Sequence, residues 1–358
     1  MMNIDFHYGV IYVVARLGGL APPQAQTVAH ACQYIDDATT PGLLQFADGE
    51  LFERFASAHK LFDYHNMDDD LNRLVWTPFH FLPAGQGATL EQRAVCRPDS
   101  TVARDLVKHA LQRRHSANAL HRLGVTLHTY VDTWAHQGFA GIESGYNRVT
   151  HLEAEDCTRA EWFARIAQLA EHLVDDVAAH VLTHTLPLGH GAALSYPDLP
   201  WAKWSYVNGK DERIERDNLP DFIAAADMAC RVVRAFCADT DDFAGQPGLP
   251  ADAKIALQRL LADSRSMDEM LRLNVICDSV AAGAIPGVQE RVPAYIPKGE
   301  GSWKHIATGI RVVGDGRLQP KWTRAFEDSD YRKFHDAVKE HRFAVVQEIL
   351  PAHGLRLA

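Results

Sequence analysis

The stretch at 120–139 constrains the fold of this chain more than any other, because it has the pattern of one helix with histidines and an aspartate on a single face. A helix advances about 100° per residue, so positions four and seven apart share a face. His128, Asp132 and His136 follow at intervals of four, and His121 lies seven before His128. A buried aspartate is costly unless a cation or hydrogen bonds compensate its charge. The pattern therefore predicts a metal site, with hydrogen-bonded core histidines as the alternative.

Apolar periodicity elsewhere also favours helices. Residues 284–326 are rich in Gly and Pro and contain one predicted strand at 306–313. We expect a mainly α protein, a multi-helix bundle with the metal site between helices and a loop-rich C-terminal region with minor β structure. Residues 1–240 would form the helical metal-binding core, and residues 241–358 an extension packed on it. The expected helices cover 8–17, 22–37, 100–114, 117–137, 159–185, 219–238, 251–274 and 329–350, with a short one in 50–64.

Composition narrows the class of protein. The 358 residues are 47% hydrophobic, which is enough to bury a large core. A net charge of −10 argues against a protein that binds long nucleic acid through a basic surface. The six cysteines form no C-x-x-C pair, which fits reduced thiols. The first residues lack a signal-peptide pattern, and no apolar run approaches the roughly 20 residues of a membrane span. We expect a cytoplasmic protein without a membrane span; the sequence indicates nothing about its oligomeric state.

Further candidate ligands lie outside the central helix. Asp36 and Asp37 end the helix at 22–37, where a carboxylate opposes the helix macrodipole and needs a cation or hydrogen bonds. A solvated helix end would explain the same two residues. The run His172, Asp176, His180 and His184 repeats the spacing of four, although a long surface helix would do so too. The candidate metal ligands are His7, Asp36, Asp37, His59, His80, His128, Asp132, His136, His184 and His190.

Other catalytic patterns are missing. The chain has no G-x-S-x-G elbow, no P-loop, no G-x-G-x-x-G fingerprint and no His-Glu-x-x-His. Metal-assisted hydrolysis remains, in which ions activate water and stabilise oxyanion charge. Asp36 and Asp37 are the candidate catalytic bases.

The order of the ligands resembles a known superfamily. Leu123-Gly124-Val-Thr-Leu-His128-Thr-Tyr-Val-Asp132 is similar to the Leu-Gly-x-x-x-His-x-x-x-Asp core of zinc-dependent phospholipases C and related single-strand nucleases. These proteins are all-helical and hold three zinc ions in a cleft. The resemblance, over about residues 5–190, implies that Asp132 bridges two ions, with His128 on one and His136 towards another. It also implies ligand roles for His7, for Asp36 or Asp37, for His59, and for His172 with Asp176 or else His180, His184 or His190.

The chain departs from this superfamily in two ways. It starts Met-Met rather than with the Trp whose amine ligates zinc, and the spacing from Asp132 to His136 is short. We therefore expect one to three divalent ions, zinc first, with manganese or iron as alternatives. The whole chain also resembles an uncharacterised bacterial family that starts Asn-Ile-Asp-Phe-His-Tyr-Gly, which implies no activity.

These features predict a metal-dependent hydrolase, in first place a phosphoesterase that acts on a small or lipid-headgroup phosphoester. Lys60, Arg122 and Arg148 are the candidate phosphate contacts. An HD-type phosphohydrolase is one alternative, for which the only adjacent His-Asp pair is His335-Asp336. The other is a non-catalytic, metal-stabilised helical protein that binds a partner through residues 284–326.

Overall fold

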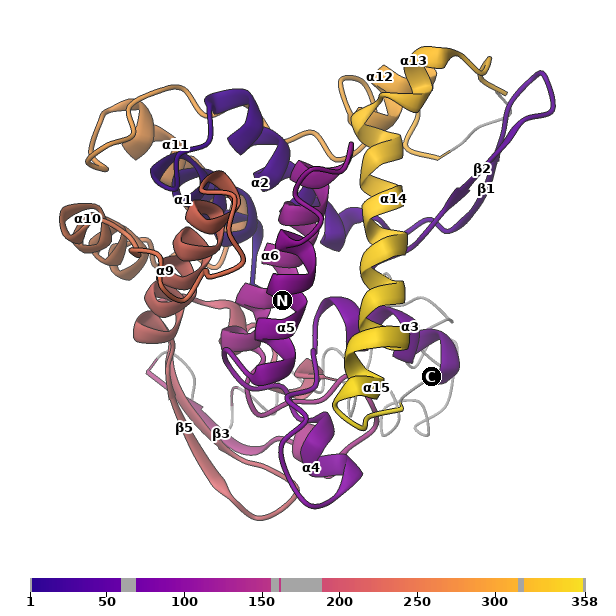
Figure 1. Ribbon diagram of the computed structural model, residues 1–358. Coiled ribbons are helices and arrows are strands. Elements are labelled where there is room, and N and C mark those ends of the chain that lie inside the picture. Colours follow the sequence, from indigo (N-terminus) through magenta and orange to yellow (C-terminus); the bar gives the residue numbers. More distant parts are fainter. Residues whose placement is uncertain (1, 59–68, 156–160, 162–188, 315–318, 357–358) are drawn as a thin grey trace.

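Helices dominate the structure, a computed structural model that describes residues 2–58, 69–155, 161, 189–314 and 319–356 (Figure 1). The long helix α6 (Ala119–Ala135) runs through the middle, and helices α2, α5, α9 and α14 pack against it. The mainly α prediction is therefore confirmed. Besides α6, the described helices are α1 (Ile11–Leu17), α2 (Pro22–Asp37), α3 (Asp69–Phe79), α4 (Leu90–Ala94), α5 (Thr101–Leu111), α9 (Asn218–Cys237), α10 (Ala251–Asp263), α11 (Glu269–Ala281), α12 (Trp303–Thr308), α13 (Arg324–Glu327), α14 (Asp330–Phe343) and α15 (Leu350–Ala352).

Two small antiparallel sheets flank the helices. In the hairpin of β1 (Gly42–Gln45) and β2 (Leu51–Arg54), Leu44 pairs with Phe52, and both side chains are buried. The second sheet has the order β3 (Thr150–Ala154), β4 (Lys203–Val207), β5 (Arg213–Asp217). The described strands thus all precede residue 218, whereas we expected the minor β structure in the C-terminal region.

The N-terminal residues enter the core as helix rather than as an extended segment. A π-helical turn, Asp5–Val10, continues directly into α1, and all six of its residues are buried. The expected first helix therefore begins three residues earlier than predicted. This early start carries the His7 side chain into the interior of the molecule.

Helices α2 and α6 approach closely at Gly124. A Cβ atom at this position would lie 2.4 Å from the carbonyl oxygen of Val28 and 2.7 Å from the Cβ of Ala31. Any larger residue would force the two helices apart, because real Cβ atoms do not approach backbone atoms so closely. This contact holds the last turn of α2 beside the C-terminal half of α6, where the predicted metal ligands lie.

Local signals predicted most helix boundaries but failed in three places. Ser100 caps α5, as expected from the sequence, by accepting a hydrogen bond from the Ala103 N–H. The expected short helix in 50–64 is wrong where the structure describes it, because 51–54 forms β2. The expected strand at 306–313 is also wrong: residues 303–308 form α12, capped by Ser302 and ended by Gly309 in the left-handed region. The helix expected at 251–274 is broken, because Asp268 caps a second helix, α11. The helix expected at 159–185 lies outside the described residues, apart from 161.

The chain ends in a helix that packs back onto the molecule. Helix α14 lies against α6, and a second π-helical turn, Ala344–Ile349, follows it. One cluster of buried apolar side chains joins Val13 of α1 to Ile276 of α11 and Val345. The division at residue 240 stays a prediction. Among the described helices, none is long and apolar enough to cross a membrane.

Candidate metal centre

Three segments bring buried His and Asp side chains together. His128 and Asp132 lie on one face of α6, and His136 ends this helix. Asp36 comes from the last turn of α2, and His80 follows α3 directly. The exposed fraction is 0% for the three histidines and Asp132, and the Asp36 side chain is 12% exposed.

Backbone carbonyl groups orient two of the rings. His128 Nδ1 lies 2.8 Å from the Cys32 carbonyl oxygen, and His80 Nε2 lies 2.8 Å from that of Ser57. A carbonyl oxygen only accepts, so these nitrogens donate, and His128 Nε2 and His80 Nδ1 carry the lone pairs of the neutral rings. The two lone-pair nitrogens are only 3.2 Å apart. Two acceptors at this distance repel each other unless a proton or a cation lies between them. The outward N–H···O=C bond is typical of metal-binding histidines.

The Asp132 carboxylate faces the same point. Its Oδ2 lies 3.4 Å from His128 Nε2 and 3.5 Å from His80 Nδ1, yet it makes no hydrogen bond with any described residue. Its Oδ1 accepts a bond of 3.2 Å from the Met2 backbone N–H. Asp36 Oδ1 is likewise buried without a hydrogen bond among the described residues, 3.7 Å from His128 Nε2. We call Asp36, His80, His128 and Asp132 the first ligand group.

His7 lies between the two carboxylates of this group. Its Nδ1 is 3.2 Å from Asp36 Oδ2, and its Nε2 is 3.2 Å from Asp132 Oδ1. Burial would lower the pKa of His7, but the Asp132 and Asp36 carboxylates raise the pKa to about 9. Without a metal ion, His7 therefore carries the positive charge that compensates part of the acidic group.

A second cluster lies beyond the end of α6. His136 donates from Nδ1 to the His80 carbonyl oxygen at 2.5 Å, which leaves the Nε2 lone pair turned away from the first ligand group. His136 Nε2 lies 3.8 Å from Asp198 Oδ1, and His190 Nε2 lies 3.7 Å from the same oxygen. His190 in turn bonds the Leu194 carbonyl oxygen through Nδ1 at 3.2 Å. We call His136, His190 and Asp198 the second ligand group.

Burial and neighbouring charges determine whether the imidazole and carboxyl groups of the ligand groups are deprotonated, which metal binding requires. Burial lowers the pKa of His128 to about 4 and that of His136 and His190 to about 3. Burial raises the pKa of a carboxyl group, yet the neighbouring histidines hold the pKa of Asp132 well below its usual range. His128 and His7 also lower the pKa of Asp36. Neutral imidazoles beside ionised carboxylates are the forms that bind divalent metal ions.

Several predicted ligands lie together, and others do not. The sets His7–Cys32–His128, Asp36–His80–His128 and His136–His190–Asp198 each place three ligand atoms within 4.8 Å of one another, so they could hold a metal ion. His121 lies elsewhere, bonded through Nε2 to Asp330 at 3.0 Å. The predicted ligands His59 and His184, together with His172, Asp176, His180 and Lys60, lie outside the described residues.

Asp37 faces away from both ligand groups. Its Oδ2 accepts a bond of 2.6 Å from the Tyr295 hydroxyl group, and Lys298 Nζ lies 4.0 Å from its Oδ1. Burial raises the pKa of Asp37. Neighbours along a helix point about 100° apart, which explains why Asp36 joins the first ligand group and Asp37 does not.

Sequence reasoning missed two residues. Asp198 lies in a 3-10 turn, Tyr196–Asp198, within an aromatic and Pro-rich loop, and no spacing rule links it to α6. Cys32 is buried beside His7 and His128. It precedes Asp36 by four residues on α2, the same spacing as in α6, so its position could have been predicted from that pattern.

The chain belongs to a family of unknown function (DUF6765), whose model matches residues 2–349. No curated protein and no solved structure gives a significant match. The family therefore supports the resemblance to an uncharacterised family and adds no support for the phospholipase C superfamily. Any function must be argued from the ligand groups themselves.

Proposed function

We propose that this protein is a metal-dependent hydrolase that cleaves small phosphoesters, with one divalent ion in each ligand group. Zinc is the ion proposed first, because imidazole nitrogen and carboxylate oxygen are its usual ligands in proteins. Manganese or iron would suit the same atoms. His7, between two carboxylates, would lose its proton or move aside when the ion enters.

The observation that carries this proposal is the set of unpaired atoms turned inward. His80 Nδ1 and His128 Nε2 face each other as lone-pair nitrogens, and Asp36 Oδ1 and Asp132 Oδ2 have no hydrogen bond among the described residues. A buried polar atom without a partner costs about 1–3 kcal/mol, and more when it is charged. Two such carboxylate oxygens beside two lone-pair nitrogens that face each other are therefore best explained by a cation.

The phosphoester assignment rests on the chemistry of the donor set. A divalent ion polarises phosphoryl oxygens and makes water a better nucleophile near neutral pH. Asp36 is the one member of the first ligand group whose side chain is partly exposed, at 12%, so its carboxylate is our candidate acceptor for the proton of the attacking water. Asp37, the other predicted base, bonds Tyr295 instead and faces away from both ligand groups.

A hydrolysis assay tests this proposal. Metal-free protein is supplied with zinc or manganese and given bis(p-nitrophenyl) phosphate and p-nitrophenyl phosphate. We expect release of nitrophenol that depends on the ion, and a loss of about 100-fold or more in Asp36→Asn, as for removal of a general base. Asp37→Asn is the matched control one residue away. A larger loss in Asp37→Asn than in Asp36→Asn would reassign the base, and no hydrolysis by metal-loaded protein would contradict the proposed reaction.

A structural metal centre is the second candidate. His7, His80, His128, Asp132 and His136 are all 0% exposed, which is typical of ions enclosed by protein ligands. Stoichiometric metal without activity on any phosphoester would favour this function. The HD-type alternative loses its residues, because His335 contacts the Phe55 backbone N–H and Asp336 pairs with Arg332.

A further inference from the structure

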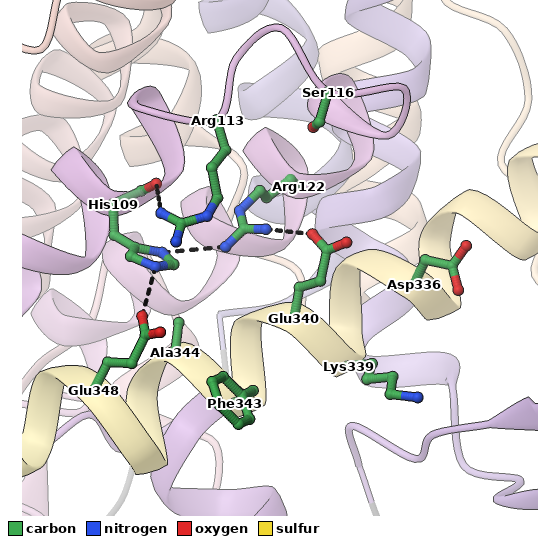
Figure 2. A pocket seen from close by; sticks show the side chains of 10 residues that line it. All are labelled: His109, Arg113, Ser116, Arg122, Asp336, Lys339, Glu340, Phe343, Ala344 and Glu348. Carbon is green, nitrogen blue, oxygen red and sulfur yellow. Dashed lines mark hydrogen bonds and ion pairs between the residues drawn. The ribbon is translucent and has the colours of Figure 1, made fainter.

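A cavity lies away from both ligand groups, between α5, α6 and α14 (Figure 2). Its volume is about 540 Å³, within the range of small-molecule sites. The walls carry charged side chains from α6, from α14 and from the turn after α5, together with Phe343 at the surface. Phe343 is 59% exposed, so its ring is accessible to a ligand.

A chain of hydrogen bonds crosses one wall. Arg122, whose side chain is 4% exposed, pairs with Glu340 and donates from Nη2 to His109 Nδ1 at 3.1 Å. His109 Nε2 then donates to Glu348 Oε2 at 2.9 Å. These bonds fix the His109 tautomer and hold the Arg122 guanidinium group toward the cavity (Figure 2).

Most of the charged side chains that line the cavity already have a partner of opposite charge or a histidine beside them. Glu340 pairs with Arg122, Glu348 with His109, and Asp336 with Arg332. Lys339 Nζ lies 3.7 Å from Glu53. Each of these acids therefore already has a cation or a histidine beside it.

Arg113 is the exception among the cations of the wall. Among the described residues Arg113 forms no ion pair, and its Nη1 donates a hydrogen bond to the His109 carbonyl oxygen at 3.3 Å. Figure 2 shows its guanidinium group beside that of Arg122, and the charge of Arg113 lowers the pKa of Arg122, which burial also lowers. The two neighbouring guanidinium groups repel each other, and among the described residues Arg113 has no carboxylate within ion-pair distance, so an anion between the two groups would relieve their repulsion.

We propose that this cavity binds a small organic phosphate, with the phosphate group between Arg113 and Arg122 and a flat ring on Phe343. Two guanidinium groups suit a phosphate because their planar forks donate paired hydrogen bonds to its oxygens. The exposed Phe343 ring suits a nucleobase, because stacking of a base on an aromatic side chain contributes about 1–3 kcal/mol. The cavity volume fits a ligand of mononucleotide size.

Binding to metal-free protein tests this assignment independently of the proposed hydrolysis. AMP, inorganic phosphate and adenosine are titrated separately by calorimetry. We expect AMP to bind, and Arg113→Gln to weaken its affinity about tenfold or more, since charge-assisted bonds to phosphate are lost. Lys108→Gln removes the same charge from an exposed position on the same helix and should leave the affinity within about twofold. Phe343→Ala should weaken AMP and leave inorganic phosphate unchanged.

Four results would count against the assignment. One is the absence of AMP binding at millimolar concentration, and another is equal affinity in wild type and Arg113→Gln. Inorganic phosphate that binds as tightly as AMP would remove the role of Phe343. Asp132→Asn should bind AMP like wild type; a loss there would move AMP to the first ligand group instead.

Discussion

Two of the regions that contain buried histidines differ in their surroundings. In the first ligand group, His80 and His128 each donate one N–H to a carbonyl oxygen and turn the other nitrogen toward carboxylates. On α14, His341 Nε2 lies 2.8 Å from the Pro78 carbonyl oxygen and 3.2 Å from Thr129 Oγ1. No described carboxylate forms an ion pair with His341. The His341 ring is therefore a buried polar group whose hydrogen-bond partners, Pro78 and Thr129, lie in the core.

His335 follows the same pattern as His341. Its Nδ1 accepts a bond of 3.4 Å from the Phe55 backbone N–H, and the rings of Phe52 and Tyr331 surround it. Burial lowers the pKa of His335 and His341 to about 3. Burial and a lowered pKa are therefore common to both regions. What distinguishes the first ligand group from the surroundings of His335 and His341 is that two acceptor nitrogens face each other beside carboxylate oxygens that have no hydrogen bond among the described residues.

The largest expected effect comes from Asp132→Asn. The change keeps the shape of the side chain but removes the charge that faces His7, His80 and His128. We expect loss of most of the bound metal from the first ligand group, measured by elemental analysis after dialysis. His341→Gln should retain the wild-type metal content. Equal metal content in Asp132→Asn and wild type would show that Asp132 is not needed to bind the metal, and the proposed difference between the two regions would be wrong.

A smaller effect is expected from Asp198→Asn. This carboxylate belongs to the second ligand group and contacts His136 and His190. If each group holds one ion, the variant should lose about half of the metal and keep the ion beside Asp132. Complete loss of metal would show instead that the two groups form one site, and no loss would exclude Asp198 as a ligand.

His341→Gln should affect stability rather than metal. The substitution disturbs hydrogen bonds to Pro78 and Thr129 and the stack on Phe79. We expect the free energy of unfolding to fall by about 1–3 kcal/mol, the usual effect of a disrupted buried polar contact. Denaturant unfolding of metal-free wild type and variant measures this. If His341→Gln changed the free energy of metal binding by more than the free energy of unfolding, His341 on α14 would belong to the metal centre.

The smallest expected effect concerns how the free energy of unfolding depends on pH, and His341→Gln tests it as well. The pKa of His341 is about 3 in the folded protein, against about 6.5 when unfolded, so the unfolded chain binds the additional proton between these values. Stability should therefore fall as the pH falls below about 6.5. The contribution of His341 to this slope is on the order of 1 kcal/mol per pH unit. Unfolding at pH 7 and pH 5 should show a shallower slope in His341→Gln, and an unchanged slope would contradict the buried neutral state.

The sequence predicted most of the long helices and the candidate ligands that lie on α2 and α6, because periodicity is local. His128, Asp132 and His136 follow from spacing along α6, and Asp36 from its place at the end of α2. Asp198 could not be predicted, because its position depends on how a loop without periodicity packs beside α6.

The direction in which a side chain leaves its helix, and its height along the axis, separated candidate ligands that spacing alone did not. Both Asp36 and Asp37 were candidates, yet Asp37 bonds Tyr295, which is 258 residues away in the chain. His121 shares a face with His128, but the rise of about 1.5 Å per residue places it about 10 Å along the axis. Long-range contacts of this kind are not encoded in a local pattern.

A crystal structure of the protein grown with zinc, with anomalous data collected at the zinc edge, tests the central claim most directly. We expect an anomalous peak about 2.0–2.1 Å from both His128 Nε2 and His80 Nδ1, the usual distance from zinc to imidazole nitrogen. A second peak is expected beside His136 Nε2. If the anomalous map shows no peak between His80 and His128 while His80 Nδ1 and His128 Nε2 are still 3.2 Å apart, the first ligand group does not bind zinc.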